Sequence, residues 1–122
     1  PATINQYVND AIGYKMTVEQ PLFYSMNCFG HADAIAFRSM LLRVHDLKTG
    51  VGPTSEHQLE VYAALFCLEY EVSPFDIGME LRIYQSNEVR VFEPTPDDIL
   101  HIMDKIITFD KRIEMMKEED KW

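Results

Sequence analysis

The sequence predicts an α/β fold in which a small mixed β-sheet is flanked by helices, in the order α-βββ-α-ββ-α. Three segments place apolar residues at helical spacing, and five others alternate or are rich in β-branched residues. Clusters of Gly, Pro, Ser and Asn separate these segments. With 122 residues, 47% of them hydrophobic, the chain suits one domain spanning residues 1–122 with a buried core.

The three helices are expected at the start, the middle and the end of the chain. The first ends near Gly13, and the second covers about 56–72. The third follows Thr95, which is a good N-cap and precedes a proline and two acids. Thr54 or Ser55 can cap the second helix.

The expected strands are short, and four of them form two hairpins. The segment 25–30 reads as a turn after the first strand, and the segment 48–57 reads as a loop. The expected strands cover 15–24, with an end at Pro21 or slightly beyond, then 31–37, 41–47, 79–85 and 88–94.

Charge and composition exclude several classes of protein. The net charge of −9 argues against general electrostatic capture of nucleic acid, which needs clustered Lys and Arg. The two cysteines, Cys28 and Cys67, lie in apolar stretches and are expected to be reduced. No apolar run reaches the ~20 residues of a membrane helix, and the N-terminus lacks a secretory pattern. We therefore expect a cytoplasmic protein that makes no membrane contact.

A candidate metal site comes from two neighbouring strands. Asp46 and Lys48 end an apolar strand and, being two residues apart, project from the same face. Asp33 enters the apolar run of the preceding strand, so a hairpin would bring it close to Asp46. Two carboxylates and the backbone carbonyl of Leu47 make an oxygen-rich site suited to Mg²⁺ or Mn²⁺.

Such a site predicts phosphodiester hydrolysis. The metal would polarise a phosphoryl oxygen and activate water, and Lys48 would position that water or stabilise developing charge. On the following helix, Gln58 and Tyr62 are four residues apart and share a face that can reach back to the strand end.

Three short motifs in this order resemble the core of RecB-type nucleases of the PD-(D/E)XK superfamily, a group that includes CRISPR-associated exonucleases and is related to phage exonucleases. The motifs are G-x-x-D, D-x-K and Q-x-x-x-Y. The resemblance covers about 15–92, and the residues that carry it are Gly30 with Asp33, Asp46 with Lys48, and Gln58 with Tyr62.

The resemblance implies a restriction-endonuclease-like core, a DNA substrate and a Mg²⁺ or Mn²⁺ cofactor. It assigns Asp33 and Asp46 as metal ligands. It assigns Lys48 as the catalytic lysine and places Gln58 and Tyr62 in the site. Relatives often carry an acid on the first strand, where this sequence has Glu19.

The chain departs from the family pattern at its N-terminus. Family members usually have an earlier helix whose His or Glu completes the metal shell. Here the short helix near Asn9 and Asp10, or Glu19, or another chain would have to supply that ligand. Small phage-type exonuclease domains of the family would look like this sequence, and we expect an exonuclease or a nuclease that prefers single strands, since no segment resembles a base-reading helix.

Three alternatives remain open from the sequence. His31, His45 and His57 could form a zinc or iron site with the aspartates, although strand alternation directs His45 away from Asp46. The protein could be a non-catalytic accessory or interaction subunit with a nuclease fold, or an acidic DNA mimic that inhibits an enzyme. The broad apolar face of the last helix, with Met115, Met116 and Trp122, also suits packing on a second copy or a partner subunit.

Overall fold

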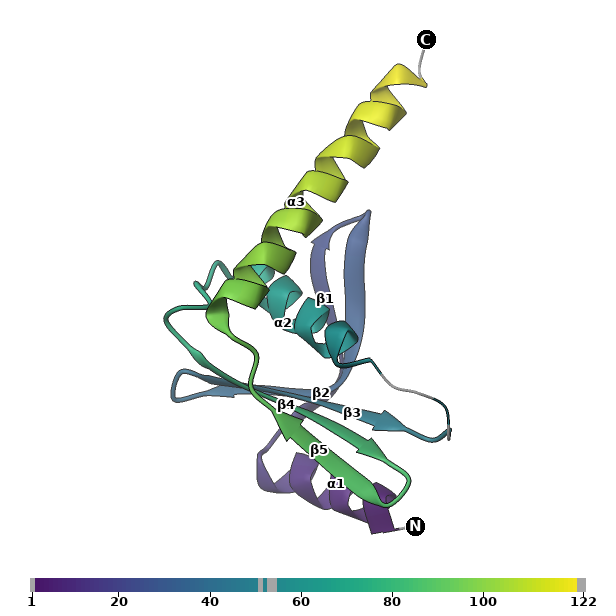
Figure 1. Ribbon diagram of the computed structural model, residues 1–122, viewed down its shortest axis with the longest axis vertical. Helices are drawn as coiled ribbons and strands as arrows, with labels where there is room; N and C mark the ends of the chain where they lie inside the picture. Colours follow the sequence, from purple (N-terminus) through teal and green to yellow (C-terminus); the bar gives the residue numbers. More distant parts are fainter. Residues whose placement is uncertain (1, 51, 53–54, 121–122) are drawn as a thin grey trace.

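The protein has three layers, with a central sheet between helices (Figure 1). The computed structural model describes residues 2–50, 52 and 55–120. Helix α1 (Ala2–Gly13) covers one face of the sheet, and helices α2 (Glu56–Tyr70) and α3 (Pro96–Glu119) lie over the other. The α/β architecture and the order α-βββ-α-ββ-α are as the sequence predicts.

The sheet is mixed and its strands follow one another in sequence order. Only β3 and β4 run parallel, and they are joined by the crossover that contains α2. The other neighbours are antiparallel, and both predicted hairpins are present. The strands are β1 (Thr17–Ser25), β2 (Cys28–Arg38), β3 (Leu41–Lys48), β4 (Gly78–Gln85) and β5 (Glu88–Phe92).

The main core lies between the sheet and α2. Burying each large aliphatic side chain there stabilises the fold by roughly 1.5–3 kcal/mol. The central parallel strands β3 and β4, the strands β1 and β2, and helices α2 and α3 all supply buried residues to it. Members of this core are Leu22, Leu42, Val44, Leu59, Ala63, Leu81, Ile83 and Ile99.

The helix ends follow local chemistry with small corrections to the sequence prediction. Helix α2 ends at Tyr70 because Glu71 adopts a left-handed conformation (φ 55°) and its N–H donates to Cys67. Ser55 is the N-cap residue, but its side chain makes no capping hydrogen bond, and Thr54 lies outside the described residues. The Thr95 hydroxyl accepts the N–H of Asp98 at 3.1 Å, as expected.

Strands β1 and β2 also form a hairpin, which is not among the two predicted, and β2 begins earlier than the sequence predicts. The predicted turn over 25–30 is wrong beyond Asn27, because Gly30 pairs with Leu22 and Phe29 pairs with Phe23. The same hairpin curls out of the sheet plane towards α3 (Figure 1). Its turn is held there by Asn27, whose side-chain amide donates to Asp110 of α3 at 2.9 Å.

Strand β2 changes face along its length. Gly30 lies against Tyr62 of α2, and Phe37 packs on Phe66 of the same helix, with ring centroids 5.2 Å apart. Residues seven apart in a regular strand point to opposite faces, so the strand must bend between these two contacts. Asp33 lies in that interval.

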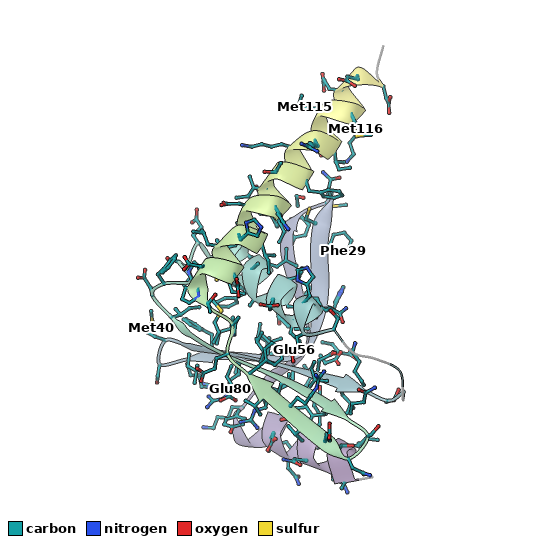
Figure 2. All side chains as sticks on the ribbon, in the orientation of Figure 1. Phe29, Met40, Glu56, Glu80, Met115 and Met116 are labelled. Atoms are coloured by element: carbon teal, nitrogen blue, oxygen red, sulfur yellow. The ribbon has the colours of Figure 1, made fainter. Side chains whose placement is uncertain are left out.

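Helix α3 extends well beyond the body of the protein (Figure 1). Its apolar stripe buries Ile99 and Ile102 but continues to Phe109, Met115 and Met116, which are 53%, 63% and 57% exposed. Figure 2 shows the two methionines on the projecting end. The predicted Trp122 contact lies outside the described residues. No helix in the described part of the chain has the length and apolar character needed to cross a membrane.

Candidate functional site

The end of β3 carries an ion pair between Asp46 and Lys48. Lys48 Nζ lies 2.9 Å from Asp46 Oδ2, as the two-residue alternation predicts. The carboxylate is buried, whereas about a third of the Lys48 side chain is exposed. A hydrogen bond to Asp46 raises the pKa of Lys48 against the opposing effect of burial, so this side chain stays an ammonium at neutral pH.

The ion pair continues into α2 through two further hydrogen bonds. Lys48 Nζ donates to Gln58 Oε1 at 3.2 Å, and Gln58 Nε2 donates to the Tyr62 hydroxyl at 2.9 Å. Gln58 and Tyr62 are one helical turn apart, which allows both to face the strand end. The structure thus links Asp46, Lys48, Gln58 and Tyr62 in one continuous chain.

Gly30 makes room for the Tyr62 ring. A Cβ atom at Gly30 would lie 2.9 Å from Tyr62 Cε1 and 3.3 Å from Cδ1, which is closer than real Cβ contacts. The glycine of the G-x-x-D motif therefore has a steric role here: it lets the tyrosine lie directly on β2.

Asp33 joins the same site from β2. Its Oδ2 accepts the backbone N–H of Leu47 at 2.9 Å, which fixes the backbone between Asp46 and Lys48. Continuing the pairing of Ala34 with His45 places Asp33 across from Asp46. Burial, then hydrogen bonding to Asp33, raises the pKa of Asp46 to about 6, while Lys48 opposes the shift.

This close pair of carboxyl groups fits a hard divalent cation. Two partly buried carboxylates in contact repel each other unless a proton or a cation lies between them. Mg²⁺ and Mn²⁺ prefer such oxygen ligands. Asp33 and Asp46 are the residues that would hold the ion, with the Leu47 backbone between Asp46 and Lys48. The Leu47 N–H donates to Asp33. The role of the Leu47 carbonyl as a metal ligand stays a prediction.

Glu19 lies beside the pair on β1. It sits between Val18 and Gln20, which pair with residues on either side of Asp33, so it is opposite Asp33. Its φ of 51° is left-handed, which is uncommon for a glutamate in a strand. Glu19 and Asp33 line a hollow of about 400 Å³ with Leu47 and Tyr7. Within the described residues, no three Asp, Glu, His or Cys side chains are close enough together to hold a metal ion.

Tyr7 of α1 is a site residue that the sequence reading missed. It lines the hollow beside Glu19, and burial followed by the charges of Asp33 and Asp46 raises its pKa. Its spacing with other apolar residues predicts the first helix and gives Tyr7 no particular role, in the core or in the site. No signal in the sequence alone distinguishes these two roles, because only the docking of α1 on the sheet decides which residue faces the hollow.

The other α1 candidates lie elsewhere. Asp10 accepts hydrogen bonds from the Tyr84 hydroxyl at 2.6 Å and from Arg82 at 3.3 Å, so it anchors α1 to β4. Asn9 is exposed. The sequence suggests that this part of the helix could supply a metal ligand. The structure does not support this for Asp10, because its carboxylate already binds Tyr84 and Arg82.

The histidines do not come together. His45 is fully buried on the α1 face of β3, where its Nδ1 lies 3.2 Å from the Tyr84 hydroxyl. His31 and His57 are exposed on β2 and α2. As alternation predicts, His45 points away from Asp46, and the described residues contain no histidine-based metal cluster.

Comparisons with known proteins leave the family open. No protein-family model matches the sequence, and no curated protein matches it. Among solved structures, the chain is similar to the crystal structure of SSO0001, with 12% identity and a TM-score of 0.46. The similarity covers 88% of this chain and 57% of SSO0001, so the chain spans little more than half the length of that protein. At this TM-score the likeness carries no argument about function.

Proposed function

We propose that the protein is a metal-dependent DNA nuclease with a restriction-endonuclease-like core. The observation that carries this proposal is the hydrogen-bonded chain from Asp46 through Lys48 and Gln58 to Tyr62, with Asp33 beside it. A buried acid pair, a charged lysine and a helix that fixes the lysine are the parts that phosphodiester hydrolysis needs. We expect an exonuclease or a nuclease that prefers single strands.

Each residue of the chain has a distinct role in this mechanism. When bound, Mg²⁺ or Mn²⁺ supplies Lewis-acid chemistry that polarises a phosphoryl oxygen and makes water a better nucleophile. Asp33 and Asp46 hold the ion. The Lys48 ammonium has three donors, and its contacts with Asp46 and Gln58 direct two of them. The third donor is available to the attacking water or to the phosphate.

Gln58 and Tyr62 act through Lys48. The Gln58 oxygen accepts from Lys48, and its amide nitrogen donates to Tyr62, so the tyrosine sets the orientation of the amide. Both are positioning residues: they hold the ammonium beside Asp46 against the conformational entropy of a long, partly exposed side chain. Glu19 and Tyr7 border the hollow and are placed to contact the ion's solvent shell or the substrate.

Cleavage of end-labelled DNA tests the proposal. Wild-type protein is incubated with single- and double-stranded substrates in Mn²⁺, in Mg²⁺ and in EDTA. We expect metal-dependent cleavage, and we expect Lys48→Ala to reduce it by at least about 100-fold, the effect of losing one group that stabilises developing charge. Lys111→Ala, on an exposed site of α3, is the matched control and should cleave as the wild type does.

Two results would contradict this function. One is the absence of metal-dependent cleavage by folded wild-type protein on either substrate. The other is equal cleavage by wild type and Lys48→Ala, which would point to a contaminating nuclease. The length of the labelled products separates exonuclease from endonuclease action.

A non-catalytic accessory subunit is the second candidate. The projecting half of α3, with exposed Phe109, Met115 and Met116, favours it because such an apolar stripe suits a partner helix. This role predicts a folded protein without cleavage activity that forms a complex through α3.

A further inference from the structure

Two adjoining hollows lie along α3. One, of about 330 Å³, lies along α3 beside Phe109 and Arg112. The other, of about 230 Å³, lies between α2, α3 and the start of β2. Both are lined by Lys105 and Phe109, so they form one surface, which we call the α3 groove. Its defining residues are Cys28, His57, Val61, Lys105, Phe109 and Arg112.

The groove is basic in a chain whose net charge is −9. Lys105, Arg112, His57 and His101 line it, against a single acid, Asp104. Among the described residues, Lys105 and Arg112 have no ion-pair or hydrogen-bond partner, whereas most other cations do. Unpaired cations gathered on one surface of an acidic protein indicate an anionic ligand.

An exposed aromatic ring lies between the two cations. Phe109 is one turn after Lys105 and almost one turn before Arg112, and it is 53% exposed. The seven residue steps from Lys105 to Arg112 span about 10 Å along the helix. Aromatic faces flanked by cations are how proteins bind single-stranded nucleic acid: the base stacks on the ring and the phosphates meet the charges.

The groove shares two elements with the candidate site. On α2, His57 and Val61 line the groove, and the next residues, Gln58 and Tyr62, belong to the hydrogen-bonded chain. On β2, Cys28 lines the groove, two residues before the glycine that supports Tyr62. The groove and the candidate site are therefore built on the same two elements, α2 and β2.

We propose that the α3 groove binds single-stranded DNA beside the cleavage site, with a base stacked on Phe109 and phosphates paired with Lys105 and Arg112. This inference rests on the proposed nuclease function. Single strands are favoured over duplex because only unpaired bases offer a free face to the ring. A second copy of this acidic chain is the other occupant to test, through the same Phe109 stripe.

The test measures binding in EDTA, where no cleavage occurs, by fluorescence anisotropy of a labelled oligothymidylate. The double variant Lys105→Gln/Arg112→Gln should bind at least about 10-fold more weakly. The slope of log affinity against log salt should fall by about 1.4, because each phosphate contact on single strands contributes about 0.7. Phe109→Ala should weaken binding about 10-fold, the loss of one stacked base, with the salt slope unchanged.

The matched control removes two other unpaired cations, in Lys15→Gln/Lys111→Gln. It changes the net charge equally but lies outside the groove, so its affinity and salt slope should stay close to wild type. Circular dichroism and sedimentation of every variant establish its folding and its mass. All of these substitutions are at exposed positions.

The inference would be overturned if the groove and control variants weakened DNA binding equally. It would also be overturned if the groove variants converted a dimer to a monomer without changing DNA affinity. These outcomes are separate from failure of the nuclease proposal. Normal cleavage with unaffected binding by the groove variants would reject the groove alone. Groove-dependent binding by a protein that cleaves nothing would support the groove and reject the nuclease.

Discussion

His45 and Asp46 are consecutive residues of β3 with opposite surroundings and opposite pKa shifts. Asp46 faces Asp33 and Lys48, and burial and Asp33 raise its pKa to about 6. His45 faces α1, and burial and the charge of Arg82 lower its pKa to about 4. The Tyr84 hydroxyl donates to Asp10 and so accepts from His45 Nδ1–H. Nε2 has no partner among the described residues, so a second proton there would have no acceptor.

These shifts predict opposite effects of pH on stability in EDTA. The His45 pKa is lower in the folded state, so the unfolded state binds more protons as pH falls, and stability is lost between about pH 6.5 and 4. The Asp46 pKa is higher in the folded state, so stability is gained between about pH 6 and 4. From about pH 7 to 5 these changes amount to about 2 kcal/mol lost and about 1 kcal/mol gained.

Urea unfolding at both pH values checks this prediction with two variants. Asp46→Asn removes the stability that protonation of Asp46 adds at low pH, so this variant should lose more stability on acidification than the wild type. His45→Gln removes the loss and should become more stable at the lower pH. The account is wrong if all three proteins respond to pH alike.

Gly30 provides a second test at the scale of single residues. Gly30→Ala places a methyl group against the Tyr62 ring and should cost about 1–3 kcal/mol of unfolding free energy. It should also reduce cleavage, because displacing Tyr62 releases Gln58 and then Lys48. Gly13→Ala, where no atom lies within 4 Å, is the matched control: it should leave cleavage unchanged and should not lower stability, because alanine favours the helix more than glycine does.

A double variant separates the clash from other effects at Gly30. Combining Gly30→Ala with Tyr62→Ala removes the ring that the new methyl group would meet. The losses of stability in the two single variants, Gly30→Ala and Tyr62→Ala, should then sum to more than the loss in the double variant. Additive losses would show that the glycine is needed for another reason.

At the scale of elements, the lining of the hollow depends on how α1 is fixed to the sheet. The anchor is Asp10, which binds Tyr84 and Arg82, and Tyr84 is fully buried. The Tyr7 ring packs edge-on against Tyr84 at 5.5 Å, so the same contact positions the α1 residue that borders the hollow.

Loss of this anchor should loosen α1. Asp10→Ala leaves the buried Tyr84 hydroxyl without its acceptor and removes one of the two carboxylates of Arg82, which keeps Glu80, and should cost about 2–3 kcal/mol. Amide hydrogen exchange should accelerate in α1 before it does in β3 and β4. Asn9→Ala, on the exposed side of the same helix, is the control. Uniform exchange across the molecule would instead indicate that α1 is not a separate unit.

The parts of the site that follow from local periodicity could be predicted from the sequence. Two-residue alternation places Asp46 beside Lys48, and a four-residue step places Gln58 beside Tyr62. The position of Asp33 beside Asp46 could be predicted as well, because it requires only the hairpin between β2 and β3. Tyr7 and the polar anchor of Asp10 could not be predicted, since both depend on how α1 docks, which no local pattern encodes.

The same difference between local pattern and tertiary packing explains where the observed fold departs from the predicted one. The segment 28–30 was expected to be a turn because Asn27 and Gly30 favour turns, but pairing with β1 and contact with Tyr62 hold it in a strand. The apolar stripe of α3 is expected to pack in the core, with its Met115 and Met116 end suited to a second copy or a partner subunit, and its first half does lie in the core. Its second half lies beyond the sheet, and a stripe alone does not reveal where the body of the protein ends.

At the scale of the whole molecule, the charge distribution matters more than the net charge. The net charge of −9 argues against general electrostatic capture of nucleic acid, yet the α3 groove gathers Lys105 and Arg112, whose side chains form no ion pair among the described residues. The acids of the site itself are consistent with a cation that neutralises them. An acidic protein can in this way offer one local basic path to a nucleic-acid strand.

The central claim is that Asp33 and Asp46 share one divalent cation, and Mn²⁺ titration of the full chain by calorimetry tests it most directly. We predict one site in the wild type, lost in Asp33→Asn and in Asp46→Asn and retained in the exposed control Asp76→Asn. Affinity should rise as the pH is raised through about 6, because the ion displaces the proton of Asp46. A folded protein that binds no Mn²⁺, or binds it equally well in all four forms, would contradict the account.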